Sequence, residues 1–199
     1  GGPELEVNVL TTGYWPTTPV PQCALPVEVK RCCDAFGKFY LSKHTGRKLT
    51  WQTNMGGADL KARFGENWHE LSVSTYQMCI LMLFNASDTL SLDEIQERTS
   101  IPEPDLKRHL ISLCTPRHKV LKKQSKGKLI VEGDSFSFNP EFSSKFKRVK
   151  VPLVSLKETE GEGRVDPNEV PPHVEEDRRH LIEAAIVRIM KARKALQHN

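Results

Sequence analysis

The segment STYQMCILMLFN, residues 74–85, constrains the fold of this chain more than any other stretch. It is long enough for a helix and carries apolar side chains on most sides, so we expect a helix that is buried and not confined to the surface. A buried helix must be covered by other elements on several faces. With 199 residues and 38% hydrophobic residues, the chain can supply a core of that kind.

The residues before this helix predict a small α+β unit over residues 1–73. ELEVNVL, residues 4–10, alternates apolar and polar side chains, which is the period of a half-buried strand, and we expect this strand at a sheet edge. Apolar side chains at helical spacing predict a helix over residues 27–42. HTGRKLTW is typical of a turn that leads into another strand, and residues 58–73 alternate around a GENW turn as a hairpin does.

Residues 74–155 predict a second domain with the winged-helix order, in which three short helices precede a β-hairpin. Ser91 and Glu94 form a capping-box pattern that starts the second helix. Ser100 is the candidate cap of the third helix, with Pro102 at an early helical position. KVLKKQ, LIV and FSFN then follow as short segments separated by SKGK and EGD turns.

The composition changes near residue 156. Residues 156–173 are rich in Glu, Gly and Pro and predict a flexible acidic linker. Residues 174–199 predict an amphipathic helix with acids near its start and bases toward its end, which suits the helix dipole. The predicted fold class is therefore α+β: a small α/β unit with an edge strand, a winged-helix domain, a linker and a C-terminal amphipathic helix.

No motif for catalysis or metal binding stands out. The chain lacks a Gly-rich phosphate loop, a G-x-S-x-G elbow and an H-E-x-x-H helix, and its seven histidines pair with no cysteine at ligand spacing. Its five cysteines form no C-x-x-C pair, which favours a reducing compartment. No apolar run approaches the roughly 20 residues that span a bilayer. We expect no enzyme activity, cofactor, metal or membrane partner.

The winged-helix pattern leaves a nucleic-acid function open. The expected wing is basic, with Lys119, Lys122, Lys123, Lys126 and Lys128. The third helix, however, carries Glu103 and Asp105, and a helix that reads a DNA groove should not present carboxylates to phosphates. We favour a spacer or protein-interaction module with a solvated basic wing, and winged-helix DNA binding is the alternative.

The terminal segment EAAIVRIMKARKALQHN permits three interpretations from its residues alone. It could bind a membrane surface or a partner groove, pack its apolar face on another domain, or present Lys191 as the acceptor of a covalent modifier. A lysine in such a helix is usually just solvated, so physical arguments do not choose between the three.

Several motifs together resemble the C-terminal region of the cullin family. EEDRRHLIEAAIVRIMKARKALQHN is similar to the cullin neddylation segment, in which the lysine after I-V-R-I-M receives a small ubiquitin-like modifier. LTTGYWP, FYLSKHTGRKLTWQTNMGGADLKARF, ELSVSTYQMCILMLFN and FSSKFKRVKV resemble other parts of that region. The resemblance covers essentially the whole chain and leans toward the cullin-three or cullin-four type.

This resemblance implies a non-catalytic scaffold of a cullin–RING ubiquitin ligase, working in the cytoplasm and nucleus. A RING-box protein would add a strand to the α/β unit, and we expect the pairing at Leu5, Val7, Val9 and Leu10. The RING subunit would recruit a ubiquitin-conjugating enzyme. Lys191 would accept the ubiquitin-like modifier, delivered by its own conjugating enzyme, through an isopeptide bond.

The resemblance also implies an arrangement of domains. Residues 74–155 correspond to the family's first winged helix, a rigid spacer, and residues 174–199 to the neddylation-site helix, the start of a truncated second one. We expect a substrate adaptor to bind only through an N-terminal region outside this sequence. Modification of Lys191 would shift a tethered C-terminal element between docked and released arrangements.

Overall fold

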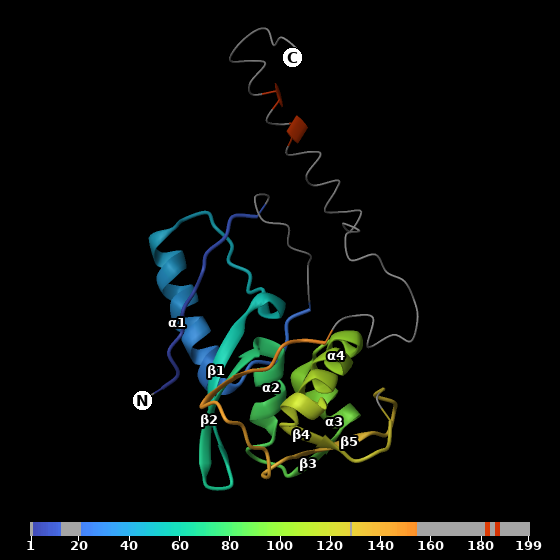
Figure 1. Ribbon diagram of the computed structural model, residues 1–199. Helices are drawn as coiled ribbons and strands as arrows, with labels where there is room; N and C mark the ends of the chain where they lie inside the picture. The colour runs from blue at the N-terminus through green and yellow to red at the C-terminus, as the bar shows by residue number, and fades with distance from the viewer. Residues whose placement is uncertain (1, 13–20, 128, 155–181, 184–185, 188–199) are drawn as a thin grey trace, which may run out of the picture. The chain divides into compact units, whose positions relative to one another are not determined.

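The computed structural model describes residues 2–12, 21–127, 129–154, 182–183 and 186–187 (Figure 1). The chain divides into two units, Gly1–Leu5 with Val20–Gly163 and Glu6–Pro19 with Arg164–Asn199. All the helices and strands named below belong to the first unit. The predicted linker at 156–173, and most of the predicted helix at 174–199, lie outside the described residues.

A helix and a three-stranded sheet form the first half of this unit. Helix α1 spans Val27–Lys43, the short 3-10 helix η1 spans Thr53–Met55, and strands β1 and β2 span Gly57–Phe64 and Asn67–Ser74. The two strands pair antiparallel along their whole length, from Gly57 opposite Ser74 to Phe64 opposite Asn67, which confirms the predicted hairpin. A late strand, β6 at Arg148–Lys150, pairs parallel with β2, so the strand order is β1-β2-β6.

Three helices and a second sheet follow the hairpin. Helices α2, α3 and α4 span Thr75–Leu83, Leu92–Thr99 and Glu103–Cys114, and the 3-10 helix η2 spans Pro116–His118. Strands β3, β4 and β5 span Thr89–Ser91, Leu121–Lys123 and Ser135–Phe138, and they pair antiparallel in the order β3-β5-β4. The mixture of helices and small sheets agrees with the predicted α+β class.

Capping boxes start two of these helices. Ser74 accepts a hydrogen bond from the Gln77 N–H, and the Gln77 side chain accepts one from the Ser74 N–H. Ser91 and Glu94 make the same reciprocal pair at α3, as the sequence predicted. Each pair satisfies backbone N–H groups that a helix start leaves without partners, so these boundaries follow directly from local sequence.

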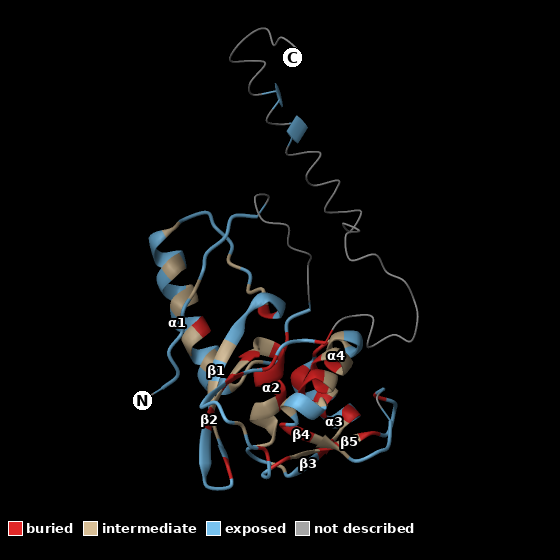
Figure 2. Ribbon diagram, viewed as in Figure 1, coloured by how far each residue is buried: buried red, intermediate tan, exposed pale blue. Residues whose placement is uncertain are grey.

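Helix α2 lies at the centre of the unit, between the β1–β2 hairpin and helices α3 and α4 (Figure 1). Its residues from Tyr76 to Ile80 are buried, as the sequence predicted for this segment. The hydrophobic core is continuous and reaches from Cys23 to Val151, and Figure 2 shows the buried residues gathered around α2 and α4. One buried polar pair crosses it, since Gln77 Nε2 donates to Ser112 Oγ over 2.6 Å.

The prediction of a strand at residues 4–10 is wrong for the chain by itself. Residues 2–11 form no strand, because alternation of side chains supplies an apolar face but a strand also needs a ladder partner. The turn predicted at HTGRKLTW leads through η1 into β1, which is the strand expected after it. Residues 129–131, the LIV segment, belong to a loop and not to a strand.

The third helix begins differently from the prediction. Ser100 does not cap α4 but ends α3, with φ 54 in the left-handed region and its N–H bonded to the Gln96 carbonyl over 2.7 Å. The N-cap of α4 is Pro102. A serine next to a helix boundary fits either end, so the residue type alone could not decide which helix it serves.

Candidate functional site

The residues predicted to pair with a partner strand are mostly exposed. Leu5, Val9 and Leu10 are 37%, 46% and 52% exposed, and Val7 is half-buried. Strand addition uses backbone groups without a ladder partner and side chains that fill pockets, and within the described residues positions 4–10 belong to no strand. The geometry is therefore compatible with the predicted role, and that role stays a prediction.

Strand β1 offers a second unpaired edge, which sequence reasoning missed. Within the described residues β1 pairs only with β2, so its outer edge carries no ladder. Its residues alternate between exposed and half-buried, which leaves Ala58, Leu60 and Ala62 as a shallow apolar row. The signal in the sequence was the hairpin itself, because a hairpin always has two outer edges and only one is taken by β6.

Side-chain contacts join helix α1 to the loop that follows it. Phe36 meets Trp51 edge-on with ring centroids 5.9 Å apart, and Arg47 Nη1 donates to Tyr40 Oη over 2.8 Å. Of the residues of α1 only Cys33 is buried. Phe39 of α1 is 61% exposed, but single exposed apolar side chains are ordinary on protein surfaces and define no site.

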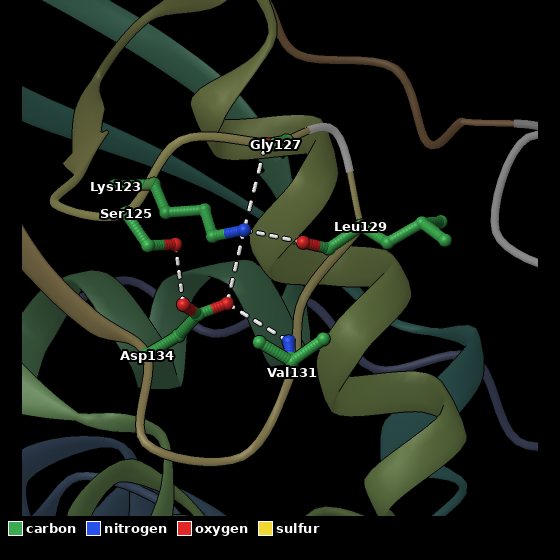
Figure 3. Close-up of polar contacts among 6 residues, drawn as sticks. All are labelled: Lys123, Ser125, Gly127, Leu129, Val131 and Asp134. Carbon is green, nitrogen blue, oxygen red and sulfur yellow. Dashed lines mark hydrogen bonds and ion pairs between the residues drawn. The ribbon is translucent and has the colours of Figure 1, made fainter.

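The basic residues predicted for the wing are not all solvated. Lys119 and Lys126 are exposed, and Lys122 lies 2.5 Å from the exposed Glu141 carboxylate. Lys123 is different, because its side chain is 10% exposed and its ammonium lies 3.0 Å from Asp134 (Figure 3). The interpretation of Lys123 as a solvated wing residue is wrong. Lys128 lies outside the described residues.

Asp134 organises the loop around this ion pair. Its carboxylate accepts hydrogen bonds from Ser125 Oγ and from the Val131 N–H, while Lys123 also donates to the carbonyls of Gly127 and Leu129 (Figure 3). Burial raises the pKa of Asp134, but the Ser125, Val131 and Lys123 bonds outweigh it and hold the pKa below its ordinary value. The loop is therefore fixed from within by its own charges.

The charges of α4 are also engaged within the chain. Lys107 Nζ lies 2.6 Å from the Glu103 carboxylate one turn earlier, and Arg108 Nε donates to the Val154 carbonyl over 2.9 Å. These two bases would have to leave their partners to contact phosphates. The arrangement favours a helix that serves packing over one that reads a DNA groove.

Lys191, the predicted modification site, lies outside the described residues. Four positions near it are described, at 182–183 and 186–187, and all four are helical. Ile182, Ile186 and Val187 are 59%, 50% and 49% exposed. The neddylation-site assignment therefore stays a prediction from sequence.

The described residues contain no group of three or more His, Cys, Asp or Glu side chains that could hold a metal ion. Among the same residues, no helix is long and apolar enough to cross a membrane. Among the described residues, the candidate site is therefore the strand-free segment at residues 4–10 together with the outer edge of β1.

Comparison with known proteins gives the family. Residues 9–142 match the cullin alpha+beta domain. The chain is 56% identical to cullin-3B of Arabidopsis thaliana over 201 residues and 46% identical to cullin-4A of Homo sapiens over 196 residues, covering 100% and 98% of this chain. Cullin-3 of Dictyostelium discoideum is 44% identical over 230 residues. The chain belongs to the cullin family.

The alignments also show how much of each relative is represented. The chain spans 27%, 25% and 29% of the lengths of these three cullins. Relatives of both the cullin-3 and the cullin-4 type match nearly the whole chain, in agreement with the resemblance that the sequence motifs carry.

Proposed function

We propose that this chain is a scaffold segment of a cullin–RING ubiquitin ligase that holds a zinc-bearing RING-box protein and presents Lys191 to a ubiquitin-like modifier. The observation that carries the proposal is the apolar segment at residues 4–10, which belongs to no strand among the described residues, in a chain that belongs to the cullin family. An incoming strand would satisfy backbone groups that the segment leaves open, and Leu5, Val7, Val9 and Leu10 would supply side-chain contacts.

The first unit would act as a rigid support within the scaffold, while residues 6–10 of the pairing segment belong to the second unit. We interpret residues 74–155 as a winged helix, since α2, α3 and α4 precede the antiparallel β4–β5 pair. The support is stiff because one core runs through the hairpin, the helices and the second sheet.

The chain supplies no catalytic chemistry in this proposal. Lys191 attacks a thioester of the modifier as a neutral amine and becomes part of an isopeptide bond, so it is a substrate. Substrate adaptors enter through parts of a cullin beyond this sequence. DNA binding is less well supported, because Lys107, Arg108 and Lys123 already bind groups of the chain itself.

Co-expression with a RING-box protein tests strand addition. Val7→Pro removes a backbone donor and fixes φ in the pairing segment, so little complex should be recovered. Val7→Thr is the matched control, because it keeps the N–H and the β-branched shape, and it should give the same yield as the parent chain. Equal recovery of complex with Val7→Pro would show that the segment recruits nothing.

A further inference from the structure

Ser125 lies in the exposed loop that follows β4, yet its hydroxyl reaches a buried carboxylate. Residues 124–127 are all exposed, whereas the Asp134 side chain is only 2% exposed. Ser125 Oγ donates a hydrogen bond to Asp134 Oδ1 (Figure 3). A residue at the protein surface is therefore joined directly to a charge in the interior.

The two oxygens of the Asp134 carboxylate have different partners. Oδ2 accepts the Val131 N–H over 2.8 Å and lies 3.0 Å from Lys123 Nζ. Within the part of the chain that the structure describes, Oδ1 accepts a hydrogen bond only from Ser125. A hydroxyl has a single proton to donate. A modification that replaces this proton therefore leaves one oxygen of a buried carboxylate without a donor, which is destabilising.

Asp134 in turn holds the loop and the start of a helix. Its partner Lys123 donates to the carbonyls of Gly127 and Leu129 (Figure 3). The main-chain carbonyl of Asp134 accepts the Leu92 N–H over 2.9 Å at the start of α3. A change at the Ser125 hydroxyl is thus transmitted through Asp134 to the loop between β4 and β5 and to α3.

The sequence around Ser125 is basic. Lys122 and Lys123 stand three and two positions before it, Lys126 follows it directly, and no Asp or Glu lies within six positions on either side. Lys122 is paired with the exposed Glu141, a surface contact that solvent weakens. Kinases select substrates by such charge patterns, and an enzyme with acidic pockets recognises bases placed before the acceptor. The pattern fits a kinase of this basic-residue-directed class.

We propose that Ser125 is a phosphorylation site, and that its phosphate releases the loop that the Lys123–Asp134 pair holds in place. A serine kinase supplies ATP as the phosphoryl donor. Ser125 Oγ attacks the γ-phosphorus, an Oγ–P bond forms, the bond from that phosphorus to the bridging oxygen breaks, and ADP leaves. The hydroxyl proton passes to the catalytic base of the kinase.

The phosphate acts on Asp134 in two ways. It removes the hydrogen bond to Oδ1, and it places a charge of about −1.5 to −2 beside a carboxylate that has almost no contact with water. Lys123, on a flexible stem, then has a second and stronger anion within reach. The buried carboxylate loses its donor and shares its counter-ion, so the loop opens.

A phosphate beside lysines can also order a loop, and the position of Asp134 decides between the two effects. Where the lysines face only solvent, a phosphate gains ion pairs and tightens the segment. Here Lys123 is already paired with a carboxylate in the interior, so any bond from Lys123 to the phosphate is made at the expense of Asp134. The net result is loosening of residues 125–134.

The test uses a cullin chain that extends beyond this sequence, treated with ATP, Mg²⁺ and the catalytic subunit of cyclic-AMP-dependent protein kinase, which selects bases before the acceptor serine. Mass spectrometry should place the principal phosphate on Ser125. Ser125→Ala should abolish that product. Ser144→Ala is the matched control, because Ser144 also neighbours a lysine but has none before it within six positions, and it should leave the product unchanged. Absence of phosphate from Ser125 would overturn the proposal.

Hydrogen exchange of the same samples tests the release. Amides of residues 126–134 and of Leu92 should exchange about fivefold or more faster after phosphorylation, while those of β1 and β2 stay unchanged. Equal or slower exchange in the phosphorylated loop would contradict the proposed opening.

Two substitutions of matched shape test the charge without a kinase. Ser125→Asp places a second carboxylate beside Asp134, whereas Ser125→Asn keeps a side chain that can donate to it. The proposal predicts faster exchange of residues 126–134 in Ser125→Asp than in Ser125→Asn, with circular dichroism showing both variants folded. Equal exchange rates in the two variants would show that charge at this position does not control the loop.

Discussion

Lys123 Nζ lies 3.0 Å from the Asp134 carboxylate, and the two side chains are only 10% and 2% exposed. The Asp134 carbonyl also accepts the Leu92 N–H at the start of α3 over 2.9 Å. One residue therefore connects the loop between β4 and β5 to the helix that precedes them. A buried charge of this kind is tolerated because its partner and its hydrogen bonds compensate for lost hydration.

Asp134→Asn should destabilise the chain by about 2 kcal/mol, because the substitution leaves Lys123 buried without its counter-ion. The loss should be smaller than for a fully buried ion pair, because the exposed loop beside this pair lets solvent screen the charges. Urea unfolding monitored by circular dichroism measures the loss. Adding Lys123→Met should recover part of it. The matched control is Lys122→Met, which breaks only the exposed pair with Glu141 and should hardly change stability. Equal losses of stability in Asp134→Asn and Lys122→Met would contradict the assignment of the buried Lys123–Asp134 pair as the stabilising one.

Ser100→Gly should stabilise the chain by about 0.5–1 kcal/mol, because glycine adopts the left-handed conformation without steric cost. Ser100 has φ 54 and ends α3. Ser100→Val, with a β-branched side chain at the same place, should destabilise it. Denaturant midpoints for the two variants check the sign, and a loss of stability in Ser100→Gly would show that the Ser100 side chain matters more than its backbone.

Stability should fall as the pH drops through about 6.5, partly because of His109. Burial lowers the pKa of His109, although the Asp105 carbonyl bond acts against it and the Arg108 charge acts with it. Below pH 6.5 the folded chain then binds fewer protons than the unfolded chain. The contribution of His109 to stability is therefore present above that pH and is lost as the pH falls toward the pKa of His109 in the folded state.

The variant His109→Leu should flatten the slope of stability between pH 7 and pH 5.5. His118→Asn is the comparison, because burial and Arg117 lower the pKa of His118 as well, and it should flatten the slope less since it is less buried. An unchanged slope in His109→Leu would assign the acid sensitivity to other groups.

Lys191→Arg, made in a cullin chain that extends beyond this sequence, should abolish the single principal modifier adduct and leave RING-box binding intact. Guanidinium stays protonated and cannot attack the thioester, whereas charge and helix propensity are kept. Lys194→Arg is the matched control and should preserve the adduct. Mass spectrometry that places the modifier on Lys194 of the parent chain would show that Lys191 is the wrong residue.

Local signals predicted much of this fold, and pairings between distant segments account for what they missed. The capping box of Ser91 and Glu94 lies within the first turn of α3, so local sequence was sufficient to predict it. The parallel pairing of β6 with β2 joins residues far apart in the chain, and FKRVKV gives only a weak alternation as a sign of it.

The distinction between local signals and contacts of distant segments also applies to the candidate site. The alternation of ELEVNVL identified the apolar side chains at residues 4–10 but could not show whether a ladder partner exists. The burial of Lys123 depends on Asp134, which is distant from it in the loop, so it cannot be read from spacing. Side-chain environments that require the assembled core are beyond pattern-based prediction.

Hydrogen exchange of the backbone amides at residues 5–10, measured with and without a bound RING-box protein, tests the central claim most directly. Strand addition gives these amides carbonyl partners, so their exchange should slow by about tenfold or more in the complex. The exchange of the β1 amides should be measured in the same experiment, because β1 has the other open strand edge. Amides of the exposed loop at residues 125–127 serve as the internal reference and should not change. A stable complex in which residues 5–10 exchange as fast as in the free chain would contradict the account.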